Sequence, residues 1–281
     1  MSTSIRKVNL FILGAQKCGT TTLFHNLKTH PKIHAGNKKE MHHFSLESNY
    51  QQGEVYYHQQ YGDMNKTNDY SYIIDSSPIY IYIPHCANRI YTYNNKVKLV
   101  VLLREPIERA YSAWHMYQRF NHWGNEQKHQ FLKNREFSNK CEQDHKNAEY
   151  FLKLLWAKKF PSFESMVEED LRNIQFENIS FIGLVNRGLY IQQILNYLKY
   201  FKRNQICILS SAALLADKQL QLQRIFNFLE IEQPDWEMFD LKDYGIGSYQ
   251  PKIPQPVKGK LNEFFHPHNT ALFEFLSDEL W

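Results

Sequence analysis

The sequence predicts an α/β fold in which a central parallel sheet carries helices on both faces. Two observations indicate this class. Short apolar runs, such as residues 97–103, have the length and composition of strands that are buried on both faces. Segments with apolar residues at helical spacing follow these runs, and short polar turns join the two kinds of segment. Strands that alternate with helices in this way form a mostly parallel sheet.

The first half of the fold begins with a strand, a turn and a helix. The apolar run 8–13 is the first strand and ends at Gly14. Residues 20–29 form a helix that stops before Pro31, because the residue before a proline disfavours helical backbone. The remaining predicted strands cover residues 72–75, 97–103, 179–184 and 205–209.

The second half adds helices and a polar insertion. A proline is tolerated in the first turn of a helix, so we expect Pro106 to open a helix that reaches about Arg119. Apolar spacing predicts another helix near 189–198. Residues 121–147 are rich in His, Asn, Gln and Lys and have little apolar period. We therefore expect a single domain over 1–281 with a polar insertion at about 121–147.

Composition excludes several classes of protein. The chain has 281 residues, of which 43% are apolar and 22% charged, so it is not intrinsically disordered. No apolar run approaches the roughly 18 residues that a membrane-spanning helix needs. The four cysteines are isolated from one another in the sequence, which indicates reduced thiols rather than a disulfide framework. We expect a cytoplasmic protein without a membrane partner.

The positive charge is concentrated near the N-terminus. The whole chain carries a formal charge of +4, but residues 1–40 hold seven Lys and Arg against one acid, Glu40. This stretch therefore carries +6, and the other residues sum to 4 − 6 = −2. It lacks the aromatic-interleaved motif of a nucleic-acid-binding surface, so no nucleic-acid partner is expected. The search for a functional site therefore starts at this N-terminal stretch.

Residues 14–23 (GAQKCGTTTL) form the turn between the first strand and the first helix. Such a turn presents backbone N–H groups and the positive end of a helix dipole to an anion. In the Walker A motif a lysine follows the last glycine, whereas here Thr20 takes that place and Lys17 precedes Gly19. The pattern predicts a P-loop-like phosphate site and disfavours a magnesium nucleotide, with an ordinary connecting turn as the alternative.

The turn resembles the 5′-phosphosulfate loop of sulfotransferases that use 3′-phosphoadenosine 5′-phosphosulfate (PAPS). Residues 104–114 (REPIERAYSAW) resemble the 3′-phosphate motif R-x-P-x-x-R-x-x-S of the same family, about 85 residues further on. The segments 39–44, 187–190 and 261–269 are similar to motifs of the heparan-sulfate-type and bacterial branch. The resemblance implies the P-loop-like α/β fold of that family and PAPS as the sulfuryl donor.

The resemblance also implies roles for individual residues. Lys17 would stabilise charge on the leaving phosphate, and Glu40 matches the position of the general base. His42 matches another active-site position and is the second candidate for the base, or an orienting partner. The implied donor-binding residues are Lys17, Gly19, Thr20, Thr21, Thr22, Arg104, Ser112 and Arg187. No metal is expected.

The acceptor, which is the substrate that receives the sulfuryl group, is less well defined by the sequence. The insertion at about 121–147 is not covered by the resemblance, and we expect it to shape the acceptor site. Many relatives carry a catalytic Lys in an E-K-(S/T)-P segment, where this chain has Ser76 within D-S-S-P. The missing cation favours a small neutral or cationic acceptor, whose hydroxyl or amine receives the sulfuryl group. Candidates are a secondary metabolite such as an alkaloid, or a small glycan. A P-loop kinase or NTPase is an alternative because residues 71–75 mimic a Walker B strand, and a non-catalytic nucleotide-binding protein is a third hypothesis.

Overall fold

The computed structural model describes residues 6–62, 69–134, 142–176, 182–245 and 253–281. The chain divides into two compact units, each of which is described by itself. The first comprises Met1–Arg104, Gln192–Gly247 and Asp278–Trp281, and the second comprises Glu105–Ile191 and Ser248–Ser277. The prediction of a single domain over 1–281 stays a prediction.

The first unit is built on a five-stranded parallel sheet with the order β2-β3-β1-β4-β5. The central strand β1 is buried along its whole length, and Leu10 lies opposite Ile74 on one side and Lys98 on the other. The apolar runs therefore form strands buried on both faces, as the sequence predicts. The strands are β1 (Leu10–Gly14), β2 (Ile33–Ala35), β3 (Tyr72–Ser76), β4 (Lys98–Leu103) and β5 (Ile206–Ser210).

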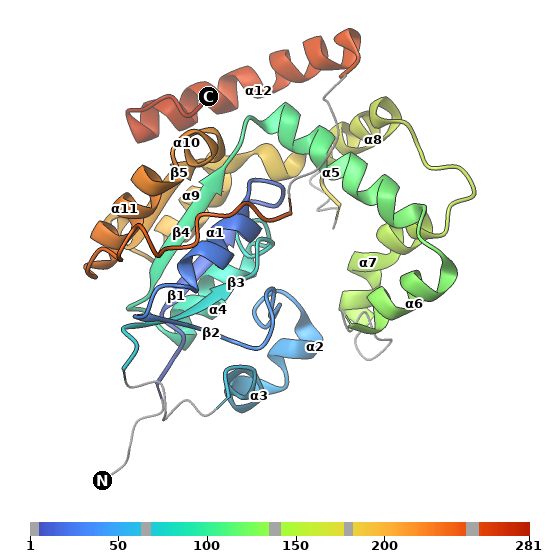
Figure 1. The fold of residues 1–281 in the computed structure, drawn as a ribbon. Coiled ribbons are helices and arrows are strands. Elements are labelled where there is room, and N and C mark those ends of the chain that lie inside the picture. Colours follow the sequence, from blue (N-terminus) through green and yellow to red (C-terminus); the bar gives the residue numbers. More distant parts are fainter. Residues whose placement is uncertain (1–5, 63–68, 135–141, 177–181, 246–252) are drawn as a thin grey trace. The chain divides into compact units, whose positions relative to one another are not determined.

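Helices cover both faces of this sheet (Figure 1). The connection β1-α1-β2 runs toward one edge and β3-α4-β4 runs toward the other, so right-handed crossovers place α1 and α4 on opposite faces. On the α1 side, the ring of His30 lies 4.7 Å from Phe226 of α11. On the α4 side, Tyr197 of α9 donates a hydrogen bond to the Tyr80 carbonyl at 2.9 Å. The helices are α1 (Thr20–Leu27), α2 (Glu47–Tyr50), α3 (Gly53–Gln59), α4 (His85–Tyr93), α9 (Tyr190–Leu198), α10 (Ser211–Ala216) and α11 (Lys218–Leu229), with the short η3 (Arg203–Gln205) before β5.

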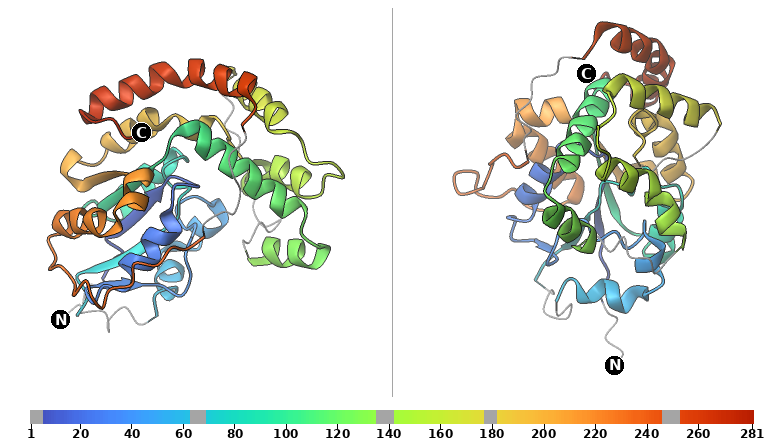
Figure 2. Two further views of the ribbon diagram at one scale, coloured as in Figure 1. Left: turned by 45° about the horizontal axis from the view of Figure 1, so that its top comes forward. Right: turned by 90° about the vertical axis from the view of Figure 1, so that its right-hand side faces the viewer.

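The second unit is helical. Its apolar core gathers around α5, whose buried face packs with residues of α7, α8, the η2 segment and α12. Figure 2 shows α12 as one continuous helix, although Pro267 lies inside it. The elements are α5 (Pro106–Asn121), α6 (Asn125–Asn134), α7 (Glu142–Leu155), α8 (Phe163–Gln175), η2 (Asn186–Gly188) and α12 (Gln255–Leu276).

Most of the predicted elements are confirmed. The strands predicted at 8–13, 72–75, 97–103 and 205–209 are present with ends shifted by one or two residues, and Pro106 opens α5. The strand predicted at 179–184 falls partly outside the described residues, and its described part, 182–184, is not a strand. Ile182 and Leu184 are instead buried in the helical core of the second unit, which explains their apolar character.

The polar stretch 121–147 contains α6 and the start of α7. A helix needs only one apolar stripe, which here includes Phe131 and Leu132 packed against the core, so its overall composition looks polar. Among the described helices, none combines the length and the apolar composition that crossing a lipid bilayer requires.

Candidate active site

The carboxyl ends of the parallel strands place the predicted site residues of the first unit. Strands β1, β3 and β4 end at Gly14, Ser76 and Leu103, and all three ends lie at the same edge of the sheet. The chain runs from β1 outward to β2 on one side, while β4 and β5 lie on the other. In open α/β sheets, ligands bind at the carboxyl edge where the strand order reverses in this way.

The loop after β1 has the geometry of a phosphate-binding turn. The Ala15 N–H donates to the Leu102 carbonyl at 2.7 Å and fixes the start of the loop on β4. Lys17 and Gly19 then adopt left-handed backbone conformations, with φ of 69° and 88°. Gly19 is the N-cap of α1 and has no side chain, so no side-chain cap hydrogen bond occupies the first turn of the helix. An anion can bind the N–H groups there.

The end of β1 also packs closely on the turn after β3. A Cβ atom built on Gly14 would lie only 2.9 Å from the Pro78 carbonyl oxygen, so only glycine fits at this position. The phosphate-binding turn and the turn 76–78 are therefore adjacent parts of one edge of the sheet.

Thr22, predicted as a phosphate ligand, has a different use for its hydroxyl. The hydroxyl donates to the Tyr244 carbonyl at 2.9 Å and accepts the Tyr244 N–H at 3.0 Å. Only the N–H of Thr22 is left for a phosphate. Thr20 is buried and Thr21 is half-buried in the first turn of α1, and their predicted contacts with the donor stay predictions.

The segment Asp240–Gly245, which we call the strap, lies along α1. Asn26 donates to the Asp240 carbonyl at 2.7 Å, and His25 stacks on Tyr244 with ring centroids 4.3 Å apart. The Tyr244 hydroxyl in turn donates to the Asp240 carboxylate at 2.7 Å. Sequence reasoning missed the strap, because its contacts with α1 join residues more than 200 positions apart.

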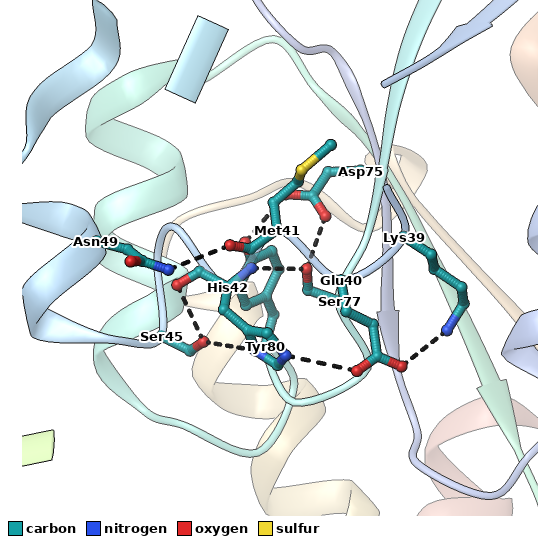
Figure 3. Close-up of polar contacts among 9 residues, drawn as sticks. All are labelled: Lys39, Glu40, Met41, His42, Ser45, Asn49, Asp75, Ser77 and Tyr80. Atoms are coloured by element: carbon teal, nitrogen blue, oxygen red, sulfur yellow. Dashed lines mark hydrogen bonds and ion pairs between the residues drawn. The ribbon is translucent and has the colours of Figure 1, made fainter. Parts of the chain in front are cut away.

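Glu40 and His42 form a pair beside Lys39 (Figure 3). One Glu40 oxygen lies 3.0 Å from the Lys39 amine, and the other lies 3.4 Å from Nε2 of His42. Nδ1 of His42 lies 3.3 Å from the Ser45 hydroxyl. The side chain of Glu40 is 29% exposed, against 13% for His42, so the carboxylate is the more accessible of the two. The two predicted base candidates are therefore in contact rather than being alternatives at separate places.

Asp75 lies behind this pair and was missed as a site residue. Its carboxylate is 1% exposed and accepts hydrogen bonds from Ser77 at 2.8 Å, Tyr57 at 2.8 Å and Tyr80 at 3.0 Å. Burial raises the pKa of Asp75, and the three hydroxyl donors oppose that rise. The D-S-S-P segment contains Asp75 and could have pointed to it, but the sequence analysis considered this segment only for the lysine that it lacks.

Arg104 and Ser112 belong to different units. Arg104 directly follows β4 in the first unit, and Ser112 is buried in α5 of the second unit. The shared phosphate contact that their motif implies stays a prediction. The start of α5 is well defined, because the Glu105 side chain accepts the N–H groups of Ile107 and Glu108 at 3.0 and 2.7 Å.

Arg187 lies in η2 of the second unit and is 3% exposed. Burial raises the pKa of the nearby Asp170, and the charges of Arg109 and Arg187 partly oppose that rise. The Asp170 carboxylate also accepts the N–H groups of Val185 and Asn186 at 2.6 and 2.9 Å. Arg187 thus helps to neutralise a buried acid, and the predicted contact of Arg187 with the donor stays a prediction.

Within the described residues, no group of three or more His, Cys, Asp or Glu side chains is placed to hold a metal ion. Three of the four cysteines fall in the described part of the chain, and each is a free thiol: Cys18, Cys86 and Cys207.

Comparisons with known proteins identify the family of the chain. Residues 7–242 match the family model described as "Sulfotransferase domain". The "Membrane-associated sulfotransferase kil1" of Dictyostelium discoideum is 24% identical over 312 aligned positions, which cover 96% of this chain and 65% of that protein. The human "Heparan sulfate glucosamine 3-O-sulfotransferase 5" is also 24% identical, with 94% of this chain and 70% of that protein covered. The chain thus spans about two thirds of the length of these relatives.

A solved structure shows the same fold. The crystal structure of a sulfotransferase from Alicyclobacillus acidocaldarius superposes with a TM-score of 0.66 at 21% identity, and the match covers 98% of each chain.

Proposed function

Because this chain belongs to the sulfotransferase family, we propose that it transfers a sulfuryl group from PAPS to a hydroxyl or amine of a small-molecule acceptor. The observation that carries the proposal is the position of an uncapped phosphate-binding turn next to a Glu–His pair at one edge of the sheet. The first element fits the donor and the second fits activation of the acceptor.

The residues of the turn suit the donor. PAPS supplies the activated sulfuryl group, and Lys17 with the first-turn N–H groups of α1 would hold its 5′-phosphosulfate end. Lys17 would stabilise the negative charge that develops on the leaving phosphate. Arg104 and Ser112 are the proposed ligands of its 3′-phosphate, as the family motif implies, and Arg187 is a further proposed donor-binding residue.

Glu40 is the proposed general base. Its partly exposed carboxylate would take the proton from the acceptor hydroxyl or amine while the acceptor attacks the sulfur. His42 lies 3.4 Å from one Glu40 oxygen and would orient that oxygen, or take up the proton from it. Lys39 holds the other oxygen at 3.0 Å, so the carboxylate has little freedom to turn.

The acceptor is proposed to be small and neutral or cationic. The position of the missing catalytic lysine is occupied by Ser76, which is buried and 1% exposed, so this position contributes no cation to bind an anionic acceptor. A secondary metabolite such as an alkaloid fits this description. A small glycan is the second candidate, because a relative is named as a heparan sulfate glucosamine sulfotransferase.

A P-loop kinase or NTPase is not favoured. That alternative needs the acid at the end of the Walker-B-like strand to reach a magnesium ion. Asp75 is that acid, and its carboxylate is buried and already accepts three hydroxyl hydrogen bonds.

We also propose that the protein acts in the cytoplasm, which cell fractionation with a tagged chain would test.

A panel of acceptors incubated with PAPS and read by mass spectrometry tests the function. We expect a product heavier by one sulfuryl group, together with 3′,5′-ADP. Calorimetry should show binding of 3′,5′-ADP without metal. Tight binding of Mg-ATP alone would overturn the sulfotransferase proposal, and 3′,5′-ADP binding without any sulfated product would indicate a non-catalytic nucleotide-binding protein.

A further inference from the structure

We propose that Asp75 is a positioning residue for the Glu40–His42 pair, acting through the hydroxyls of Ser77 and Tyr80. The inference rests on the proposed function, because it explains how the candidate base is held in place. Asp75 itself is buried, so its effect on the reaction must pass through the groups that it contacts.

Ser77 forms the first connection (Figure 3). Its hydroxyl donates to one Asp75 oxygen at 2.8 Å and accepts the N–H of His42 at 3.3 Å. A serine hydroxyl has one proton. Because the carboxylate takes that proton, the oxygen of Ser77 is left as an acceptor for His42.

Tyr80 forms a second connection of the same kind. Its hydroxyl donates to the other Asp75 oxygen at 3.0 Å and accepts the N–H of Phe44 at 3.5 Å. Tyr80 is fully buried, so water does not compete for its hydroxyl. One carboxylate therefore directs two hydroxyls toward two N–H groups of the segment that carries the base.

The segment 40–44, which we call the base loop, is held at every second residue. The N–H of Glu40 donates to the Ser76 carbonyl at 3.0 Å. The N–H groups of His42 and Phe44 donate to the hydroxyls of Ser77 and Tyr80, as described above. Glu40 and His42 both have left-handed backbone conformations, with φ of 63° and 55°. Residues other than glycine adopt this conformation uncommonly, and it costs free energy that the surroundings must offset. The hydroxyls of Ser77 and Tyr80 supply part of that constraint.

A matched pair of tyrosines tests the connection. Tyr57 and Tyr80 both donate to the same Asp75 oxygen, but only the Tyr80 hydroxyl contacts the base loop. Tyr80→Phe should lower kcat by about tenfold through misplacement of Glu40, with KM for PAPS nearly unchanged. Tyr57→Phe should change kcat by less than about twofold. Equal kcat values in the two variants would overturn the inference.

Coupling to the base gives a further test. If Tyr80 acts through Glu40, adding Tyr80→Phe to the Glu40→Gln variant should lower kcat by much less than the tenfold expected in the wild-type background. A full and independent second loss would show that Tyr80 supports the fold rather than the base.

Amide hydrogen exchange tests the geometry without any acceptor. Ser77→Ala should speed exchange of the His42 amide by about tenfold, and Ser77→Thr, which keeps a hydroxyl, should restore slow exchange. Tyr57→Phe should leave that amide unchanged. A His42 amide that stays protected in Ser77→Ala would overturn the proposal even if the enzyme is active. Absence of sulfated product from the wild-type chain would instead contradict the proposed function and leave the exchange result intact.

Discussion

Replacing His43 by Phe should make the free energy of unfolding much less dependent on pH between 6.5 and 4. His43 is 2% exposed, and its ring stacks on Tyr57 with centroids 4.4 Å apart. Nδ1 of His43 is buried without a hydrogen-bond partner among the described residues. Burial, assisted by the nearby charges of His58 and Arg89, lowers the pKa of His43 from 6.5 to about 4, although a hydrogen bond of the ring to the Asn49 backbone opposes the shift.

The sign and size of the effect follow from this shift. The folded state keeps His43 neutral, whereas the unfolded chain takes up a proton below pH 6.5. The stability from this group is therefore complete above pH 6.5 and is lost as the pH falls toward 4. At about 1.4 kcal/mol per pH unit, the full loss is about 3 kcal/mol. Phe keeps the stacking and does not titrate, so the stability of His43→Phe relative to the wild type should rise by about 2–3 kcal/mol between pH 7.5 and pH 4.5.

Urea unfolding at a series of pH values between 7.5 and 4.5 measures this difference. Tyr57→Phe is the control, because it alters the same aromatic cluster but leaves His43 titratable. An NMR titration of the His43 ring should give a midpoint near 4. Parallel stability curves for the wild type and His43→Phe, or a midpoint near 6.5, would refute the reasoning.

Three further predictions concern the donor site and the base. Thr22→Val removes both hydrogen bonds to Tyr244, each worth roughly 1 kcal/mol, so amide exchange in the strap should rise about 30-fold; exchange at the wild-type rate would contradict this. Lys17→Ala should lower kcat at least about 100-fold while calorimetry still detects 3′,5′-ADP binding, and retained turnover would remove Lys17 from catalysis. Glu40→Gln should lower kcat by about 10²–10³ at unchanged KM for PAPS, whereas full activity would pass the role of base to His42.

Local patterns predicted much of the sheet and the phosphate-binding turn. The run 97–103 is apolar at every position except Lys98. Such a continuous apolar run is typical of a strand that is buried on both faces. The turn after β1 depends on Gly14 and Gly19, whose special roles are set by neighbours within the same edge of the sheet. The strands and this turn could be predicted because each depends on a few residues that are close together in the sequence.

The supports of the site were not predictable in the same way. Asp75 looks like the polar end of any strand, and its partners lie 18 residues earlier, at Tyr57, and 5 residues later, at Tyr80. Thr22 fits a phosphate-binding motif, and nothing local shows that Tyr244 occupies its hydroxyl. These roles are fixed by tertiary contacts between segments whose separation in sequence carries no periodic signal.

The way the base loop is anchored has a consequence for how readily it can be altered. In the adjacent strand β3, the hydrogen bonds to neighbouring strands are made by backbone groups, which every residue except proline supplies, so most substitutions leave the register intact. In the base loop, the N–H groups of His42 and Phe44 are held by side-chain oxygens instead. A single substitution that removes the hydroxyl of Ser77 or Tyr80 can therefore remove one of these hydrogen bonds. Positions 77 and 80 are the natural targets for changing the conformation of the base loop without disturbing the sheet.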